Sequence, residues 1–274
     1  MNNSKIIEQI NSGISAQNAK VVIFDFDGTI SLIRSGWMSV MVPMMMEILL
    51  DCKTGESEEE LRAIVEEFVW RLTGKQTIYQ MIELTEQIKS RSGAPSDPLA
   101  YKKMYLARLN DKIRNRLEGL RAKTVPPEKY LVPGAHILLE ALKERGLKMY
   151  LASGTDQEYM REEARLLNVS HYFAGGIYGA LDDYKSFSKK ILIERIIAMA
   201  ECRGDEFLGF GDGYVEIENV KGVGGVAVGV ATAEPECRTV DEWKRKRLIG
   251  VGADVIIANF LCHRELLQIL FSNG

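Results

Sequence analysis

The sequence contains few of the residues that form structural zinc sites or disulfide frameworks. Its 274 residues include four cysteines and three histidines. No two cysteines form a CxxC pair and no histidine-rich motif lies beside one, so we expect neither a zinc site nor a disulfide framework. Unpaired thiols are typical of a reducing compartment, which predicts a cytoplasmic protein. The cysteines are Cys52, Cys202, Cys237 and Cys262.

Long apolar runs are also missing. The longest apolar stretch, residues 37–50, contains Pro43 and Glu47. It is shorter than the ~20 residues that span a bilayer. The first residues, MNNSKIIEQINSG, are polar and lack the apolar segment of a signal peptide. We therefore expect no membrane partner.

The chain has no large charge excess of either sign. Lysine and arginine total 35 and aspartate and glutamate total 38, which gives a formal net charge of −3. Such a chain has no global field that would attract nucleic acid, so no nucleic-acid partner is expected. Hydrophobic residues make up 46% of the chain and charged residues 27%, which is ordinary globular composition and excludes a disordered chain. The length exceeds the roughly 100–200 residues of one typical domain.

Short apolar runs alternate with helical patterns over most of the chain. The first run, residues 21–24, is continuously apolar and ends at Asp25. A continuous β-branched run is typical of a strand buried on both faces of a parallel sheet. This alternation predicts an α/β fold with a doubly wound, Rossmann-like parallel sheet. Further strands are expected at residues 147–152, 207–210, 226–230 and 254–257, and helices at 135–145, 156–167, 189–200 and 217–221.

The region between residues 36 and 124 has a different pattern, with helical periods and no convincing strand. Ser57 and Glu60 form a capping-box pattern before the second of these helices. We therefore predict an α/β core, residues 1–33 and 125–274, interrupted by a helical domain, residues 34–124. A short helix is expected within the first 19 residues. The predicted helices of the insertion are residues 37–50, 57–72, 77–90 and 99–120.

The strongest chemical signal follows the first strand. Asp25 and Asp27 lie two residues apart and are followed by Gly28 and Thr29. In open α/β sheets, ligands bind beyond the carboxyl ends of the strands at a topological switch point. A carboxylate is costly to bury beside an apolar run, so a plain turn does not account for Asp25. The pattern favours a functional site.

Three later segments place polar groups at the same predicted sheet edge. Ser153 and Gly154 follow the second apolar run, just before a predicted helix whose free N–H groups suit an anion. Asp212 and Glu216 follow a third run. A lysine is available near the start of the helix expected at 189–200, and the candidates are Lys185, Lys189 and Lys190.

In this order and with the helical insertion, the four segments resemble the four motifs of the haloacid dehalogenase superfamily. The insertion resembles the helical cap that follows the first motif in that family. The resemblance implies that Asp25 is a nucleophile that forms an aspartyl-phosphate and binds metal. It implies that Asp27 is the general acid and base and that its backbone carbonyl ligates the metal.

The resemblance assigns the remaining groups to phosphate and metal binding. Ser153 and a lysine would bind the transferring phosphoryl group, and Asp212 would complete a Mg²⁺ site, with Glu216 supporting the lysine or the metal. Gly28, Thr29 and Gly154 would shape a phosphate cradle. Several hard oxygen ligands beside one cation agree with the needs of Mg²⁺ and of an anionic substrate. We favour Lys189 over Lys185 and Lys190, because Leu192, Ile193 and Ile196 follow it at helical spacing.

An acid two residues after the nucleophile points to the phosphatase or phosphomutase branches of that superfamily. The resemblance therefore implies a Mg²⁺-dependent hydrolase of a small phosphorylated metabolite, such as a sugar phosphate or a compound like phosphoglycolate. The alternatives are a sugar phosphomutase and a non-catalytic sugar-phosphate sensor on the same fold.

Two further groups of polar residues are open to interpretation. Residues 73–77 form a polar break between helices, which is either a plain connection or a loop that reaches the substrate. Four residues are candidates for contact with the leaving group: Arg34, Trp37, Lys75 and Gln76. The basic run at residues 244–247 follows two acids and precedes an apolar pair, which favours a solvated helix face over a nucleic-acid patch.

Overall fold

The computed structural model describes residues 6–181 and 188–271. The chain divides into two compact units. The first unit contains Met1–Ser35 and Leu117–Gly274, and the second contains Gly36–Arg116. The later boundary falls within helix α4, Pro98–Arg121.

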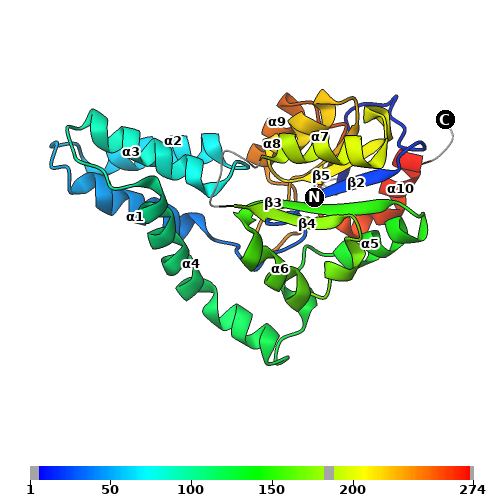
Figure 1. Ribbon diagram of the computed structural model, residues 1–274, viewed down its shortest axis with the longest axis horizontal. Helices are drawn as coiled ribbons and strands as arrows, with labels where there is room; N and C mark the ends of the chain where they lie inside the picture. Colours follow the sequence, from blue (N-terminus) through cyan, green and yellow to red (C-terminus); the bar gives the residue numbers. More distant parts are fainter. Residues whose placement is uncertain (1–5, 182–187, 272–274) are drawn as a thin grey trace, which may run out of the picture. The chain divides into compact units, whose positions relative to one another are not determined.

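The first unit is built on one mixed β-sheet, as the alternating pattern predicted (Figure 1). Its strands lie in the order β1-β7-β6-β5-β2-β3-β4, and every described pair is parallel except β1 with β7. The strands are β1 Ile7–Gln9, β2 Val21–Asp25, β3 Lys148–Asp156, β4 Gly176–Ala180, β5 Phe207–Gly211, β6 Val226–Val230 and β7 Val255–Ile257.

Helices cover both faces of this sheet. In Figure 1, α7, α8 and α9 lie over one face, and α5, α6 and α10 lie over the other. Strand β2 lies between β3 and β5. After β2, the chain first adds β3 and β4 on one side of it and then adds β5, β6 and β7 on the other side. This reversal is the switch point at which α/β sheets bind ligands. The helices are α5 Ala135–Glu144, α6 Gln157–Leu166, α7 Lys189–Ala200, α8 Tyr214–Gly222, α9 Glu242–Gly250 and α10 His263–Phe271.

The side chains of β2 alternate between the two helical layers. Phe24 stacks on Phe210 with 4.6 Å between ring centroids, on one face of the sheet. Val21 and Ile23 belong to a buried apolar cluster on the other face, which also includes Leu192 of α7. Because side chains two residues apart on a strand share a face, Asp25 lies on the α7 side.

The second unit consists of helices connected by short loops. Its first three helices are α1 Met38–Leu50, α2 Glu58–Leu72 and α3 Thr77–Ser90, and α4 follows. The capping box is confirmed: the Glu60 amide donates to the Ser57 hydroxyl at 3.2 Å, and the Ser57 amide donates to the Glu60 carboxylate at 2.9 Å. Methionines make up much of the buried face of α1, where Met41, Met44, Met45 and Met46 are buried. Within the described chain, no helix combines the length and the hydropathy needed to span a membrane.

Two local predictions were wrong, and one strand was missed. The expected N-terminal helix is instead strand β1, in which Ile7 pairs with Ile257 of β7. The sequence pattern also missed β4, a short strand with glycine at two of its five positions, which weakens the apolar signal. Strand β3 extends to Asp156 rather than ending at residue 152, because its polar end pairs with β4.

Candidate functional site

Asp25, at the end of β2, forms an ion pair with Lys189 in the first turn of α7. The Lys189 ammonium lies 2.7 Å from Asp25 Oδ1 and also forms an ion pair with Glu216, from the first turn of α8. Leu192 and Ile193 follow Lys189 by three and four residues and pack into the core, so Lys189 is carried to the same inward face. All three charged side chains are buried.

Burial dominates the electrostatics of Asp25. It raises the pKa of this carboxyl to about 7, although Lys189 opposes the shift. The neighbouring carboxylates of Asp212 and Asp27 raise it further. Desolvation disfavours the charged form of an acid, and like charges add to that effect. The site therefore concentrates negative charge that a bound cation would relieve.

The three candidate lysines have different surroundings. Lys189 contacts Asp25, whereas Lys190 is exposed on the outer face of α7. Lys185 lies outside the described residues. Among the two lysines that the structure describes, only Lys189 is placed to act on Asp25.

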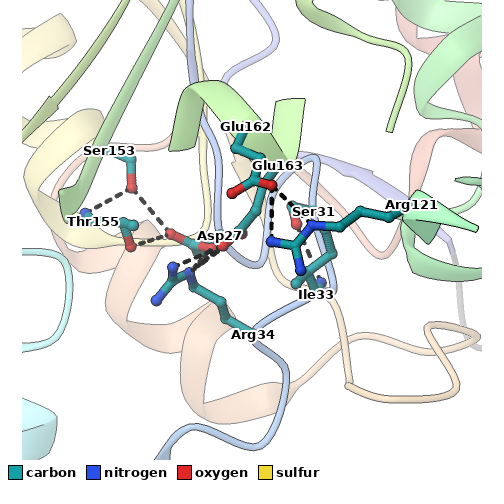
Figure 2. Close-up of polar contacts among 9 residues, drawn as sticks. All are labelled: Asp27, Ser31, Ile33, Arg34, Arg121, Ser153, Thr155, Glu162 and Glu163. Atoms are coloured by element: carbon teal, nitrogen blue, oxygen red, sulfur yellow. Dashed lines mark hydrogen bonds and ion pairs between the residues drawn. The ribbon is translucent and has the colours of Figure 1, made fainter. Parts of the chain in front are cut away.

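The Asp27 carboxylate is held by two hydroxyls from β3. Its Oδ2 accepts hydrogen bonds from Ser153 Oγ at 3.0 Å and from Thr155 Oγ1 at 2.7 Å (Figure 2). The Thr155 amide in turn donates to Ser153 Oγ at 3.0 Å. Thr155 was not among the predicted site residues, although its spacing of two residues from Ser153 on a strand puts both on one face. Gly154 lies between them, half-buried.

Asp212, after β5, is packed against the loop that follows β2. Its amide donates to the hydroxyl of the buried Thr29 at 2.9 Å. Gly28 has a φ of +78°, and a Cβ there would lie 2.2 Å from Asp212 Oδ2. Any side chain at position 28 would displace this carboxylate, so glycine is required by both conformation and space.

The interpretation of residues 244–247 as a solvated face was wrong for Lys244. Its ammonium lies 2.9 Å from Asp212 Oδ2 and 3.0 Å from Glu234 Oε1, and its side chain is mostly buried. Burial opposes the charge, but these two carboxylates raise the pKa of Lys244 above its usual value. The sequence did not show this contact, because Glu234 comes from the loop after β6 and only the fold joins it to Asp212. The next residue, Arg245, pairs with Glu8 at 2.6 Å.

Arg34 is buried within the first unit and forms a bidentate ion pair with Glu163 of α6. The shortest contact joins Arg34 Nη2 to Glu163 Oε1 at 2.7 Å. The other three leaving-group candidates belong to the second unit. There Trp37 is half-buried before α1, Lys75 is exposed near the Tyr79 ring, and Gln76 is buried at the start of α3.

The site carboxylates could hold a divalent cation together with water and carbonyl oxygens. In the chain from 6 to 181 and 188 to 271, no three side chains among His, Cys, Asp and Glu form a ready metal cluster. Asp25 and Asp212 do supply hard oxygen donors whose charges repel each other. The Asp27 side chain is bonded to hydroxyls. Two carboxylates with water and carbonyl oxygens suit Mg²⁺, which keeps several of its waters.

Comparisons with known proteins bear on the fold and the family. Several solved structures share the fold at low sequence identity. A predicted phosphoglycolate phosphatase from Haemophilus somnus is 15% identical with a TM-score of 0.59, and the match covers 92% of this chain and 99% of that chain. A haloacid dehalogenase-like family hydrolase from Streptococcus pneumoniae is 16% identical with a TM-score of 0.58, covering 92% and 99%. A putative β-phosphoglucomutase from Thermotoga maritima is 17% identical with a TM-score of 0.52, covering 90% and 98%.

No curated protein matches the sequence. A family model does match residues 19–224, a segment that includes every motif described above, and its description is haloacid dehalogenase-like hydrolase. The protein therefore belongs to the haloacid dehalogenase-like hydrolases.

Proposed function

We propose that this hydrolase cleaves phosphomonoesters of small metabolites through an aspartyl-phosphate on Asp25. The observation that carries the proposal is the different environment of the two neighbouring carboxylates. Asp25 is buried against an ammonium group, whereas Asp27 is held by two hydroxyls. Two carboxylates in different surroundings are suited to two different roles, one as nucleophile and one as acid and base.

The first step forms a bond between an Asp25 oxygen and phosphorus while the bond from phosphorus to the leaving oxygen breaks. Asp27 gives its proton to that oxygen, and the product leaves as a neutral alcohol. In the second step, water attacks the phosphoryl group and gives a proton back to Asp27. The bond between Asp25 and phosphorus breaks, inorganic phosphate leaves, and both carboxyl groups return to their starting states.

Charge control is the main difficulty of this reaction, because an anion must attack an anionic group. Lys189 contacts the Asp25 carboxylate and is held in place by Glu216. It would therefore offset charge on the transferring group. Ser153, Gly154, Gly28 and Thr29 would form the phosphate cradle.

Mg²⁺ would be held by Asp25 and Asp212 and by the backbone carbonyl of Asp27. When bound, it would mask repulsion between nucleophile and phosphate and stabilise the developing charge. Lys244 and Thr29 would keep Asp212 in place for this role. Trp37, Lys75 and Gln76 stay predicted contacts of the leaving group, and the helical unit stays the predicted cap over the site.

A phosphate-release screen tests the proposal. Metabolite phosphomonoesters, sugar phosphates and phosphoglycolate among them, are incubated with the protein and Mg²⁺, with Asp25→Asn as the blank. We expect Mg²⁺-dependent release of inorganic phosphate from at least one compound, lost in the variant. No release above the Asp25→Asn blank from any compound would reject hydrolysis and favour a binding protein.

A sugar phosphomutase is the second candidate, and its support is the fold shared with the putative β-phosphoglucomutase from Thermotoga maritima. In that reaction the phosphoryl group would pass from Asp25 to a sugar hydroxyl instead of to water. Phosphorus NMR of the reaction with a sugar 1-phosphate separates the two candidates. Accumulation of an isomer without inorganic phosphate would identify a mutase.

A further inference from the structure

Arg34 and Glu163 form a buried ion pair beside Asp27. Only 4% of Arg34 and 1% of Glu163 are exposed. The Arg34 Nε atom donates to both Glu163 oxygens at 3.1 and 3.3 Å, and Nη2 donates to Oε1 at 2.7 Å. The guanidinium also lies 5.4 Å from the centroid of the Tyr159 ring, one helical turn before Glu163.

Asp27 lies beside this guanidinium group. Arg34 Nε lies 4.0 Å from Asp27 Oδ1 (Figure 2). Asp27 Oδ1 is buried and accepts no hydrogen bond from any described residue, while Oδ2 takes both hydroxyl bonds. The carboxylate is thus held through one oxygen and faces a fixed positive charge with the other.

Stability alone does not explain why this pair is buried. Removing two charged groups from water costs about as much as their attraction returns, so a buried ion pair is weak evidence of stabilisation. The adjacent residue of the same helix, Glu162, pairs with Arg121 at 2.8 Å while both side chains stay exposed (Figure 2). An arginine–glutamate pair is therefore available on α6 without burial, and the buried pair is the one beside Asp27.

We propose that Arg34, oriented by Glu163 and Tyr159, is a positioning residue for Asp27. It fixes the Asp27 carboxyl group toward the leaving-group oxygen, while Ser153 and Thr155 hold the other oxygen. This inference rests on the proposed function, in which Asp27 donates a proton to the leaving group. It differs from the sequence interpretation of Arg34 as a direct contact of the leaving group.

The proposal predicts that Arg34 matters in proportion to the need for proton donation. An alkyl phosphate releases a basic alkoxide and needs the acid, whereas p-nitrophenyl phosphate releases a weakly basic phenolate that does not. We measure kcat/KM, which reports the first phosphoryl transfer, for both compounds with Arg34→Met. We expect a loss of roughly 10²-fold with the alkyl phosphate, a size typical of general acid catalysis, and little change with p-nitrophenyl phosphate.

Matched variants separate this role from a general effect on the fold. Arg121→Met removes the exposed pair on the same helix and should leave both kcat/KM values unchanged. Arg34→Met combined with Glu163→Gln removes both buried charges and serves if the single variant does not fold; it should show the same dependence on the leaving group. Arg34→Lys keeps the charge without the bidentate geometry and should restore part of the loss.

The outcomes are distinguishable. Equal losses on both substrates in the variants, with an active parent, would overturn the positioning role and leave the proposed function intact. A parent protein without turnover on any phosphoester would overturn both proposals.

Discussion

Two buried cations serve the two carboxylates of the first motif in different ways. Lys189 bonds directly to Asp25 at 2.7 Å and shares its charge with Glu216. Arg34 bonds mainly to Glu163 and stands 4.0 Å from Asp27. In each cluster one cation serves one carboxylate of the motif and one supporting glutamate. The clusters differ in how the cation meets the motif carboxylate: Lys189 donates a hydrogen bond to Asp25, whereas Arg34 stands beyond hydrogen-bond distance from Asp27.

This difference matches the chemistry expected of each acid. A lysine ammonium is a compact point charge that can stay beside a nucleophile and the phosphate it attacks. A guanidinium is a rigid fork that holds its shape when paired with one carboxylate, so it can orient a second one without bonding to it. An acid that must lose and regain a proton is better held by hydroxyls than by a tight ion pair, because such a pair would favour its charged form.

The largest effect should come from breaking the Lys189 cluster. Lys189→Met leaves Asp25 and Glu216 buried without their cation and removes charge stabilisation from the transferring phosphoryl group. We expect kcat to fall by roughly 10³-fold, the upper range for removing one electrostatic stabiliser. Steady-state phosphate release with Mg²⁺ measures it.

Lys190→Met is the matched control, because Lys190 is the next residue of α7 and is exposed. It should keep full activity. Full activity in Lys189→Met would move the proposed catalytic role to another lysine. The Lys189 and Arg34 clusters could then not be compared as two devices of one active site.

A third cation, Lys244, extends the comparison to Asp212. Lys244→Met should lower the free energy of unfolding without Mg²⁺ by about 2–3 kcal/mol, because Asp212 and Glu234 lose their common partner. Added Mg²⁺ should restore more stability to this variant than to the parent, since the metal would supply the missing charge at Asp212. Thermal unfolding with and without Mg²⁺ provides the measurement.

Lys221→Met tests whether any lost lysine pair gives the same result. Lys221 lies 2.9 Å from the buried Asp254, in an ion pair that includes no proposed site residue. Its loss of stability should be the same with and without Mg²⁺. Equal Mg²⁺ responses in Lys244→Met and in the parent would show that Lys244 does not act on the metal site.

The sequence predicted the parts of this site that depend on local patterns. Helical spacing selected Lys189 and predicted α7 at the residues where it occurs, and the apolar run before Asp25 marked the central strand of the sheet. These features follow from periodicity within one element, which a single sequence records directly.

The supporting contacts could not be predicted because they join distant segments. Glu163 lies on a helix rich in charged residues that has the pattern of a surface helix, yet it is buried because the fold brings Arg34 to it across 129 residues. Lys244 and Asp212 are likewise distant in the sequence, and only the fold brings them together. The charges of these residues were visible in the sequence, but their partners were set by the topology of the sheet.

A smaller effect should follow from weakening the hydroxyl side of the Asp27 cluster. Thr155→Val keeps the shape of the side chain and removes the 2.7 Å bond to Asp27 Oδ2. We expect kcat/KM for an alkyl phosphate to fall about tenfold, which corresponds to the free energy of one hydrogen bond to a charged group. Thr85→Val, which removes a hydroxyl in the second unit, is the control and should leave kcat/KM unchanged. An equal loss in both variants would show that the effect of Thr155→Val does not come from its hydrogen bond to Asp27.

The last expected effect is a change in how stability depends on pH. Burial raises the pKa of Glu163 from its usual value of 4.5 to about 7, and Arg34 opposes the shift only in part. Between these two values the folded protein binds a proton that the unfolded chain has released. The free energy of unfolding should therefore fall as pH rises from about 4.5 to about 7, with a slope of up to about 1.4 kcal/mol per pH unit from this group.

Glu163→Gln isolates that slope, because glutamine does not titrate. The pKa of Asp25 is raised in the same direction, but Asp25 is present in both proteins, so its contribution cancels in the comparison. Urea unfolding across this range should give curves that converge at low pH, with the variant gaining on the parent as pH rises. Parallel curves would mean that Arg34 keeps Glu163 ionised throughout. In that case the guanidinium would outweigh burial in its cluster, whereas the Lys189 ammonium does not outweigh burial at Asp25.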